Sequence, residues 1–166
     1  MIRLSRLTDY GIVLMSNIAA DPDRVHNAGE VAAGARLPLP TVSKLMRRLA
    51  QRELLISQRG AKGGYSLARS PDRISVGQII TALEGPVSLT VCTTGKSPGT
   101  CKHEPRCPVL GHWQRINRAI RDALDGITLA DMAAPAGAGV RSVFEPDALR
   151  HRQTLQRLAA ASGANG

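Results

Sequence analysis

The sequence predicts a mainly α-helical fold in which a winged helix-turn-helix with a small β-hairpin wing precedes a long dimerisation helix. Apolar residues recur at helical spacing through about the first 50 residues, a glycine-rich basic segment then separates two short strand candidates, and a long amphipathic pattern follows a cysteine-containing loop. The predicted domains are residues 1–86 (winged helix-turn-helix), 87–108 (cysteine loop), 108–132 (dimerisation helix) and 133–166 (a flexible tail rich in Ala, Gly and Pro).

The first helix is expected over residues 5–20, because its apolar residues keep a helical period. Leu7, Leu14 and Ile18 are expected on its inner side. Pro22 lies just beyond its end, and proline cannot continue the hydrogen-bond ladder of a helix.

Two shorter helices are expected to form the helix-turn-helix. Asn27 has the side chain of an N-cap, and Glu30 three residues later completes a box-like arrangement. The next helix begins near Pro40, a residue that suits the first helical turn. Its inner stripe consists of Val42, Leu45, Met46 and Leu49.

The wing is expected next in the chain. Residues 54–57 and 65–68 have the composition of strands, and between them lies a glycine-rich connection, residues 58–64, with cations at its tip. A fourth helix follows the capping-box pair Ser75 and Gln78 and ends at Gly85. The wing and this helix complete the predicted domain.

The long helix is expected to begin near Pro108 and to stop at Asp125–Gly126. Polar side chains, Arg121 among them, lie outside its apolar stripe. The stripe consists of Val109, Leu110, Trp113, Ile116, Ile120, Ala123 and Leu124.

Composition limits the classes of function. The 166 residues carry a formal net charge of +9, which suits a nucleic-acid binder and also fits an anionic membrane surface. No run approaches the roughly 18 apolar residues of a membrane span, and the N-terminus does not resemble a secretion signal. The odd number of cysteines, 3, argues against a disulfide framework and favours a cytoplasmic location.

The cations of the third helix and the wing are the candidate DNA contacts, because an α-helix fits the major groove and a wing suits the minor groove or the flanking phosphates. Taken singly, each of these side chains is as well explained as a solvated charge. The candidates are Thr41, Ser43, Lys44, Arg47 and Arg48 on the helix and Arg59 and Lys62 on the wing.

The three cysteines lie in one polar loop. Cys92, Cys101 and Cys107 have the spacing C-x8-C-x5-C, and thiolates are soft ligands for zinc, copper(I) or iron–sulfur clusters. A fourth ligand is needed, for which His103, Glu104 and His112 are nearby. Zinc held by the three cysteines and one histidine is the competing interpretation. No nucleophile elbow, P-loop or dinucleotide fingerprint occurs, so no enzyme is expected.

Several motifs in order resemble one family. The opening MIRLSRLTDYGIVLM, the wing RGAKGGYSLAR, the segment ISVGQIITALEGPV and the cysteine loop are similar to the IscR/NsrR-type iron–sulfur transcriptional regulators, the Rrf2 family, over about residues 1–132. The segment CPVLGHWQRINRAIRDAL resembles the branch that regulates SUF-system cluster assembly.

The resemblance implies a homodimer with crossed long helices that binds a double-stranded operator. It implies a [2Fe-2S] or [4Fe-4S] cluster on Cys92, Cys101 and Cys107 whose state changes operator affinity, and a repressor of cluster-assembly genes. A nitric-oxide-sensing repressor and a zinc-stabilised DNA-binding protein without a sensing role remain the alternatives.

The resemblance also indicates a fourth cluster ligand. In some members the fourth ligand is a carboxylate near the start of the first helix, donated by the partner subunit. Asp9 has that position here. Other members use a histidine three residues after the last cysteine, where this chain has Leu110. The first two cysteines are also further apart than is usual in the family, which leaves the cluster type open.

Overall fold

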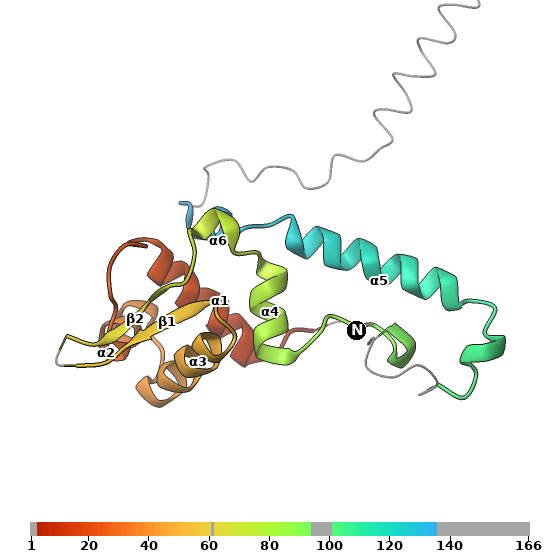
Figure 1. Cartoon of the computed structure of the whole chain (residues 1–166), viewed down its shortest axis with the longest axis horizontal. Coiled ribbons are helices and arrows are strands. Elements are labelled where there is room, and N and C mark those ends of the chain that lie inside the picture. The colour runs from red at the N-terminus through yellow and green to blue at the C-terminus, as the bar shows by residue number, and fades with distance from the viewer. Residues whose placement is uncertain (1–2, 61, 94–100, 136–166) are drawn as a thin grey trace, which may run out of the picture. The chain divides into compact units, whose positions relative to one another are not determined.

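The computed structural model describes residues 3–60, 62–93 and 101–135, and over these residues it confirms a mainly helical fold with one hairpin (Figure 1). Residues 136–166, which contain most of the predicted tail, lie outside the described residues. The α-helices are α1 (Arg6–Ala19), α2 (Ala28–Ala35), α3 (Leu39–Gln51), α4 (Val76–Glu84), α5 (Leu110–Asp125) and α6 (Leu129–Ala133). The other elements are β1 (Leu55–Gln58), β2 (Gly64–Leu67) and the 3-10 turns η1 (Pro71–Arg73), η2 (Val91–Thr93) and η3 (Glu104–Arg106).

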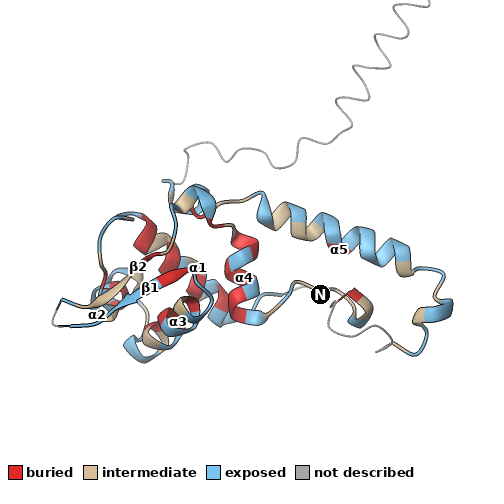
Figure 2. Cartoon of the chain, viewed as in Figure 1, coloured by how far each residue is buried: buried red, intermediate tan, exposed pale blue. Residues whose placement is uncertain are grey.

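The core lies where α1, α3 and α4 meet, and Figure 2 shows the buried residues gathered on these helices. Leu14 and Ile18 of α1 are fully buried as expected, but Leu7 is 42% exposed, so that part of the prediction was wrong. The first turn of α1 instead turns Thr8 inward, where its hydroxyl bonds to Glu84 at the end of α4.

The turn between α2 and α3 is set by a left-handed residue. Arg36 has φ 54°, and the N–H of Leu37 donates to the carbonyl of Ala32 at 3.0 Å, which satisfies a free carbonyl at the end of α2. The stripe Val42, Leu45, Met46 and Leu49 of α3 is buried as predicted. The opposite face of α3 is left to solvent.

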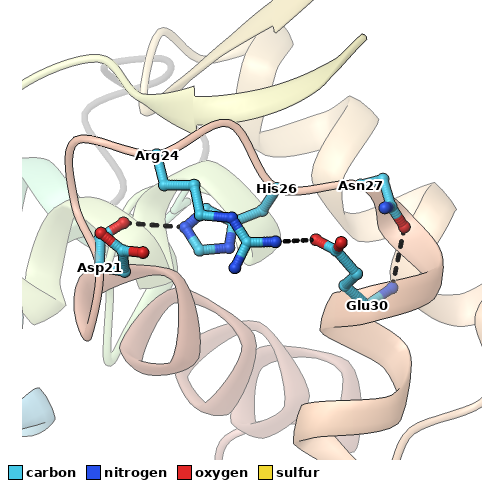
Figure 3. Close-up of polar contacts among 5 residues, drawn as sticks. All are labelled: Asp21, Arg24, His26, Asn27 and Glu30. Atoms are coloured by element: carbon cyan, nitrogen blue, oxygen red, sulfur yellow. Dashed lines mark hydrogen bonds and ion pairs between the residues drawn. The ribbon is translucent and has the colours of Figure 1, made fainter. Parts of the chain in front are cut away.

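The start of α2 differs from the expected capping box. Asn27 does accept a hydrogen bond from the Glu30 N–H at 2.9 Å, but the Glu30 carboxylate pairs with Arg24 at 2.8 Å (Figure 3). Because the carboxylate is drawn to a cation in the preceding loop, the reciprocal bond to Asn27 does not form.

The wing has a third, single-residue strand that was not expected. His26, in the loop before α2, exchanges two backbone hydrogen bonds with Tyr65 of β2, both 2.8 Å long. Its side chain is 6% exposed, and Nε2 lies 2.8 Å from the Asp21 carbonyl oxygen (Figure 3). β1 pairs with β2 in antiparallel register, and each strand is shifted by one residue from its predicted bounds.

Gly64 is the residue that permits this close approach, because a Cβ there would lie 2.5 Å from the His26 carbonyl oxygen. We expect Gly64→Ala to lower the free energy of unfolding by about 1–3 kcal/mol, as backbone must shift to admit the methyl group. Thermal and urea unfolding measure this loss. The control is Gly111→Ala in α5, where nothing lies within 4 Å; it should leave stability unchanged or raise it, and equal effects of the two substitutions would contradict the argument.

The predicted dimerisation segment, residues 108–132, contains the long helix with the expected stop at Asp125–Gly126 and a second helix that was not expected. α5 ends at Asp125, and Thr128 caps a new helix through a capping box with Asp131. α6 packs on α1, and its Leu129 is fully buried in the core. The last part of the predicted dimerisation segment therefore belongs to the winged-helix core. No helix among the described residues combines the length and apolarity needed to cross a membrane.

Candidate DNA interface and cysteine segment

The outer face of α3 presents the predicted DNA-contacting side chains together. Lys44, Arg47 and Arg48 are exposed, while Thr41 and Ser43 near the start of the helix are half-buried. α3 contains no acidic residue, and within the described chain none of its three cations forms an ion pair. Their charges are therefore free to meet phosphate or base edges.

The wing tip carries the other two candidates, Arg59 and Lys62, both exposed. Gly60 has φ 113°, and its carbonyl accepts the Gly63 N–H at 2.9 Å, so the tip is a tight turn. The two cations thus stand beyond the paired ends of β1 and β2, where Tyr65, next to the last strand pair, is bridged to His26 in the loop before α2. A projecting arm of this kind suits contacts flanking the recognition helix.

The cysteines occupy two separate turns. Cys92 lies in η2, whereas Cys101 and Cys107 flank η3. All three are free and partly exposed. Among residues 3–60, 62–93 and 101–135 no three His, Cys, Asp or Glu side chains are gathered closely enough to hold a metal ion, so the cysteines do not form such a site with Asp9, His103 or His112 in these residues.

The donor chemistry nevertheless fits an iron–sulfur cluster. Three unpaired thiols within one short stretch of chain are the soft ligand set that such clusters use. His103 and His112 are exposed, and neither has a hydrogen bond within the described residues that would orient its ring. The observations therefore favour the cysteines over the histidines as the metal-binding residues.

Polar residues of α5 fasten the segment that carries Cys92, and sequence analysis missed them. Asn117 is 4% exposed and bonds to the backbone of Val87 and Leu89. Arg121, placed outside the apolar stripe by its sequence position, is half-buried and donates to two backbone carbonyls of the same segment. Their spacing of four residues, one helical turn, is the signal that could have revealed them.

Much of α5 is exposed in the part of the chain that the structure describes, including three members of its apolar stripe (Figure 2). Val109, Trp113 and Ile116 are 44%, 37% and 45% exposed, and the one buried residue of α5 is the polar Asn117. A row of large apolar side chains open to water is typical of a protein-protein contact.

Asp9 lies exposed in the first turn of α1, at a helix start that Glu84 stabilises. The Glu84 carboxylate accepts the Thr8 hydroxyl and, at 2.7 Å, the backbone N–H of Ser5. These two hydrogen bonds, that of Thr8 first, hold the pKa of Glu84 below its ordinary value.

The lowered pKa predicts a pH dependence of stability. The carboxylate stabilises the fold fully above its unfolded pKa of about 4.3, and this contribution is lost as the pH falls through the lower folded pKa. We expect Glu84→Gln to be less stable than the wild type at pH 7 and the difference to shrink below about pH 4. Urea unfolding across pH measures this difference, with Glu53→Gln, exposed in the turn after α3, as the control. A difference that is constant with pH would contradict the assignment.

Comparison with known proteins agrees with this geometry. Residues 4–135 match the Rrf2 family, described as an iron-dependent transcriptional regulator. The chain belongs to the Rrf2 family. It is 32% identical over 146 residues to the transcriptional repressor NsrR of Streptomyces coelicolor, covering 82% of this chain and 92% of NsrR.

Solved structures of Rrf2-type regulators have the same architecture. CymR, the global cysteine regulator of B. subtilis, has a TM-score of 0.62 and 31% identity, covering 80% of this chain and 97% of CymR. IscR of T. potens has a TM-score of 0.59 and 30% identity, covering 79% and 85%. This Rrf2 protein is therefore a transcriptional regulator and not an enzyme, and regulators of this family bind DNA.

Proposed function

We propose that this Rrf2 regulator is a homodimeric repressor whose operator affinity depends on an iron–sulfur cluster, and that it controls genes of cluster assembly. The observation that carries the proposal is the pairing of two features in one chain: an unpaired basic face on α3, and three free thiols, of which Cys92 lies in a turn bonded to α5. The choice of cluster-assembly genes rests on the sequence resemblance to SUF-system regulators.

Dimerisation is supported by the exposed stripe of α5. A second copy supplies an identical stripe, and a two-fold interface of this kind buries the same side chains on both subunits. Two winged helices are then able to reach successive major grooves about 34 Å apart, so the operator should be nearly palindromic.

The cluster is proposed to bind to Cys92, Cys101 and Cys107. An iron–sulfur group would supply a ligand-dependent link between the two cysteine turns and a centre that responds to iron supply or oxidation. Asp9 is the proposed fourth ligand, donated by the partner subunit. Its exposed position in the first turn of α1 leaves the carboxylate accessible to a second chain.

Metal analysis of protein purified without oxygen tests the proposal. Iron, acid-labile sulfide and zinc are measured per chain together with the visible spectrum, for the wild type and Cys101→Ala. We expect brown wild-type protein with near-equal iron and sulfide, and a colourless Cys101→Ala variant, because loss of one thiolate leaves the cluster with too few ligands.

Two outcomes would contradict the cluster. Colourless wild-type protein with about one zinc per chain would show a structural site of the zinc type instead. Full iron and sulfide in Cys101→Ala would show that the ligand set is wrong. The Asp9 assignment is checked by Asp9→Ala, which should speed cluster loss in air without preventing assembly.

A further inference from the structure

The turn that carries Cys92 is fastened at both ends to one face of α5. Arg121 donates from Nε to the Val87 carbonyl at 3.0 Å and from Nη2 to the Thr93 carbonyl at 3.2 Å. Asn117, one helical turn earlier, accepts the Leu89 N–H at 3.1 Å and donates to the Val87 carbonyl at 3.3 Å. Two side chains thus make four hydrogen bonds to three backbone groups of residues 87–93.

The interior of the same turn is closed by hydroxyl groups. The Thr93 side chain donates to the Thr90 carbonyl at 2.8 Å, accepts the Thr90 N–H at 3.2 Å and lies 2.9 Å from the Ser88 hydroxyl. Thr93 is 8% exposed, so these bonds are shielded from water. The Thr90 hydroxyl lies 3.1 Å from the Cys92 sulfur, within hydrogen-bond distance for sulfur.

The other two cysteines have no comparable support. Among the described contacts, the sulfur of neither Cys101 nor Cys107 takes part in a hydrogen bond. The short turn η3 lies between these two cysteines. The three thiols therefore differ in how firmly the folded chain holds them.

We propose that Asn117 and Arg121 are positioning residues that seat Cys92 on α5 before any metal binds, with Thr90 as the hydrogen-bond partner of its sulfur. Cys92 is thus the member of the thiol set that the fold holds in place by hydrogen bonds. Binding a metal to a thiol in an already ordered turn costs less conformational entropy than binding it to a thiol in a flexible loop. Because this turn is bonded to α5, a change in the position of Cys92 is transmitted to α5.

We call the hydrogen bonds of Asn117 and Arg121 to residues 87–93 the Cys92 seat, and its test uses metal-free protein so that the readout does not depend on a cluster. The metal-free wild type, Arg121→Ala and Arg118→Ala are treated with iodoacetamide, and the alkylation rate of each cysteine is followed by peptide mass spectrometry. Arg118 is exposed on the same helix and makes no hydrogen bond or ion pair in the described chain, so it matches the loss of charge.

We expect Cys92 in Arg121→Ala to react about three- to tenfold faster than in the wild type, the factor that corresponds to one net hydrogen bond. Cys101 and Cys107 should keep their rates, and Arg118→Ala should match the wild type at all three. Hydrogen exchange of the Leu89 amide, which Asn117 protects, should accelerate in parallel.

A milder variant guards against misfolding. Asn117→Asp keeps an acceptor for the Leu89 N–H but replaces the donor to Val87 with a second acceptor, so it should also expose Cys92. Circular dichroism melting verifies the fold of each variant. If Arg121→Ala and Asn117→Asp fold and all three cysteines react as in the wild type, the seat is refuted.

The role of the seat in metal binding rests on the proposed function. Separate measurements test the seat and the cluster, so one can be refuted without the other. Wild-type protein without iron or sulfide would refute the cluster while the alkylation rates still decide the seat. If the wild type holds a cluster, Arg121→Ala should lose its visible absorbance faster in air than Arg118→Ala. Suppose that the two variants lose visible absorbance at equal rates although Cys92 of Arg121→Ala is alkylated faster. The seat would then act only in the metal-free protein, and its proposed role in holding the cluster would be overturned.

Discussion

Ile116→Asp is expected to convert the proposed dimer into a monomer and to weaken operator binding at least a hundredfold. Ile116 lies in the middle of the exposed stripe of α5, between Trp113 and Ile120. A carboxylate placed in an apolar two-fold interface is buried twice, and each unpaired buried charge costs several kcal/mol. A monomer binds one half-site alone. It therefore loses the gain in affinity, about 10²–10⁴, that comes from joining two DNA-binding domains in one dimer.

Sedimentation equilibrium measures the oligomeric state, and a gel-shift titration measures operator affinity. The matched control is Gln114→Asp, which adds the same charge to an exposed position on another side of α5 and should remain dimeric. If Ile116→Asp also remains dimeric at micromolar concentration, the stripe is not the interface. A monomeric Gln114→Asp would show that added charge on α5, rather than its position, breaks the dimer.

Arg47→Ala and Arg48→Ala are each expected to weaken operator binding by about 1–3 kcal/mol if the guanidinium contacts a base. Both side chains are exposed on the outer face of α3 and have no ion-pair partner in the described chain. A dimer presents each arginine twice, so the loss per dimer approaches the upper part of this range. A phosphate contact would instead weaken binding to all sequences and reduce the salt slope by about 1.

Fluorescence anisotropy with operator and unrelated DNA at several salt concentrations separates the two cases. The control is Arg115→Ala, on an exposed part of α5, which removes the same charge outside the proposed DNA interface. It should change the affinity for DNA little. Unchanged operator affinity in both α3 variants would remove α3 as the recognition helix. Equal losses in Arg115→Ala would show that net charge alone controls binding.

The elements of the winged helix were predictable because their signals are local. The buried stripe of α3 follows the helical period, and the capping box of Ser75 with Gln78 lies within one turn. The wing follows from glycines at positions where the backbone must turn, as at Gly60. The start of α6 carried an equally local signal, the capping-box pair Thr128 and Asp131, which the sequence analysis did not use.

The basic candidates were also predictable from the sequence. The seven predicted DNA-contacting residues lie on α3 and on the wing tip, and five of them are exposed while Thr41 and Ser43 are half-buried. Exposure follows from the amphipathic pattern, since a stripe that is buried leaves the opposite face to water. The ligands of the cluster, by contrast, are proposed, because the spacing of the cysteines identifies candidate thiols but does not determine how they are arranged in space.

The sequence by itself determined the class of fold, the order of its elements and the faces that carry charge or thiols, since each of these depends on residues within a few positions of one another. Only the tertiary structure decided which polar groups meet. Thr8 contacts Glu84 across 76 positions, and Arg121 reaches Val87 across 34. No periodicity encodes such pairs, because hydrogen bonding between distant segments depends on how helices pack. Packing therefore decided that Leu7 faces water and that Arg121 supports the turn of Cys92.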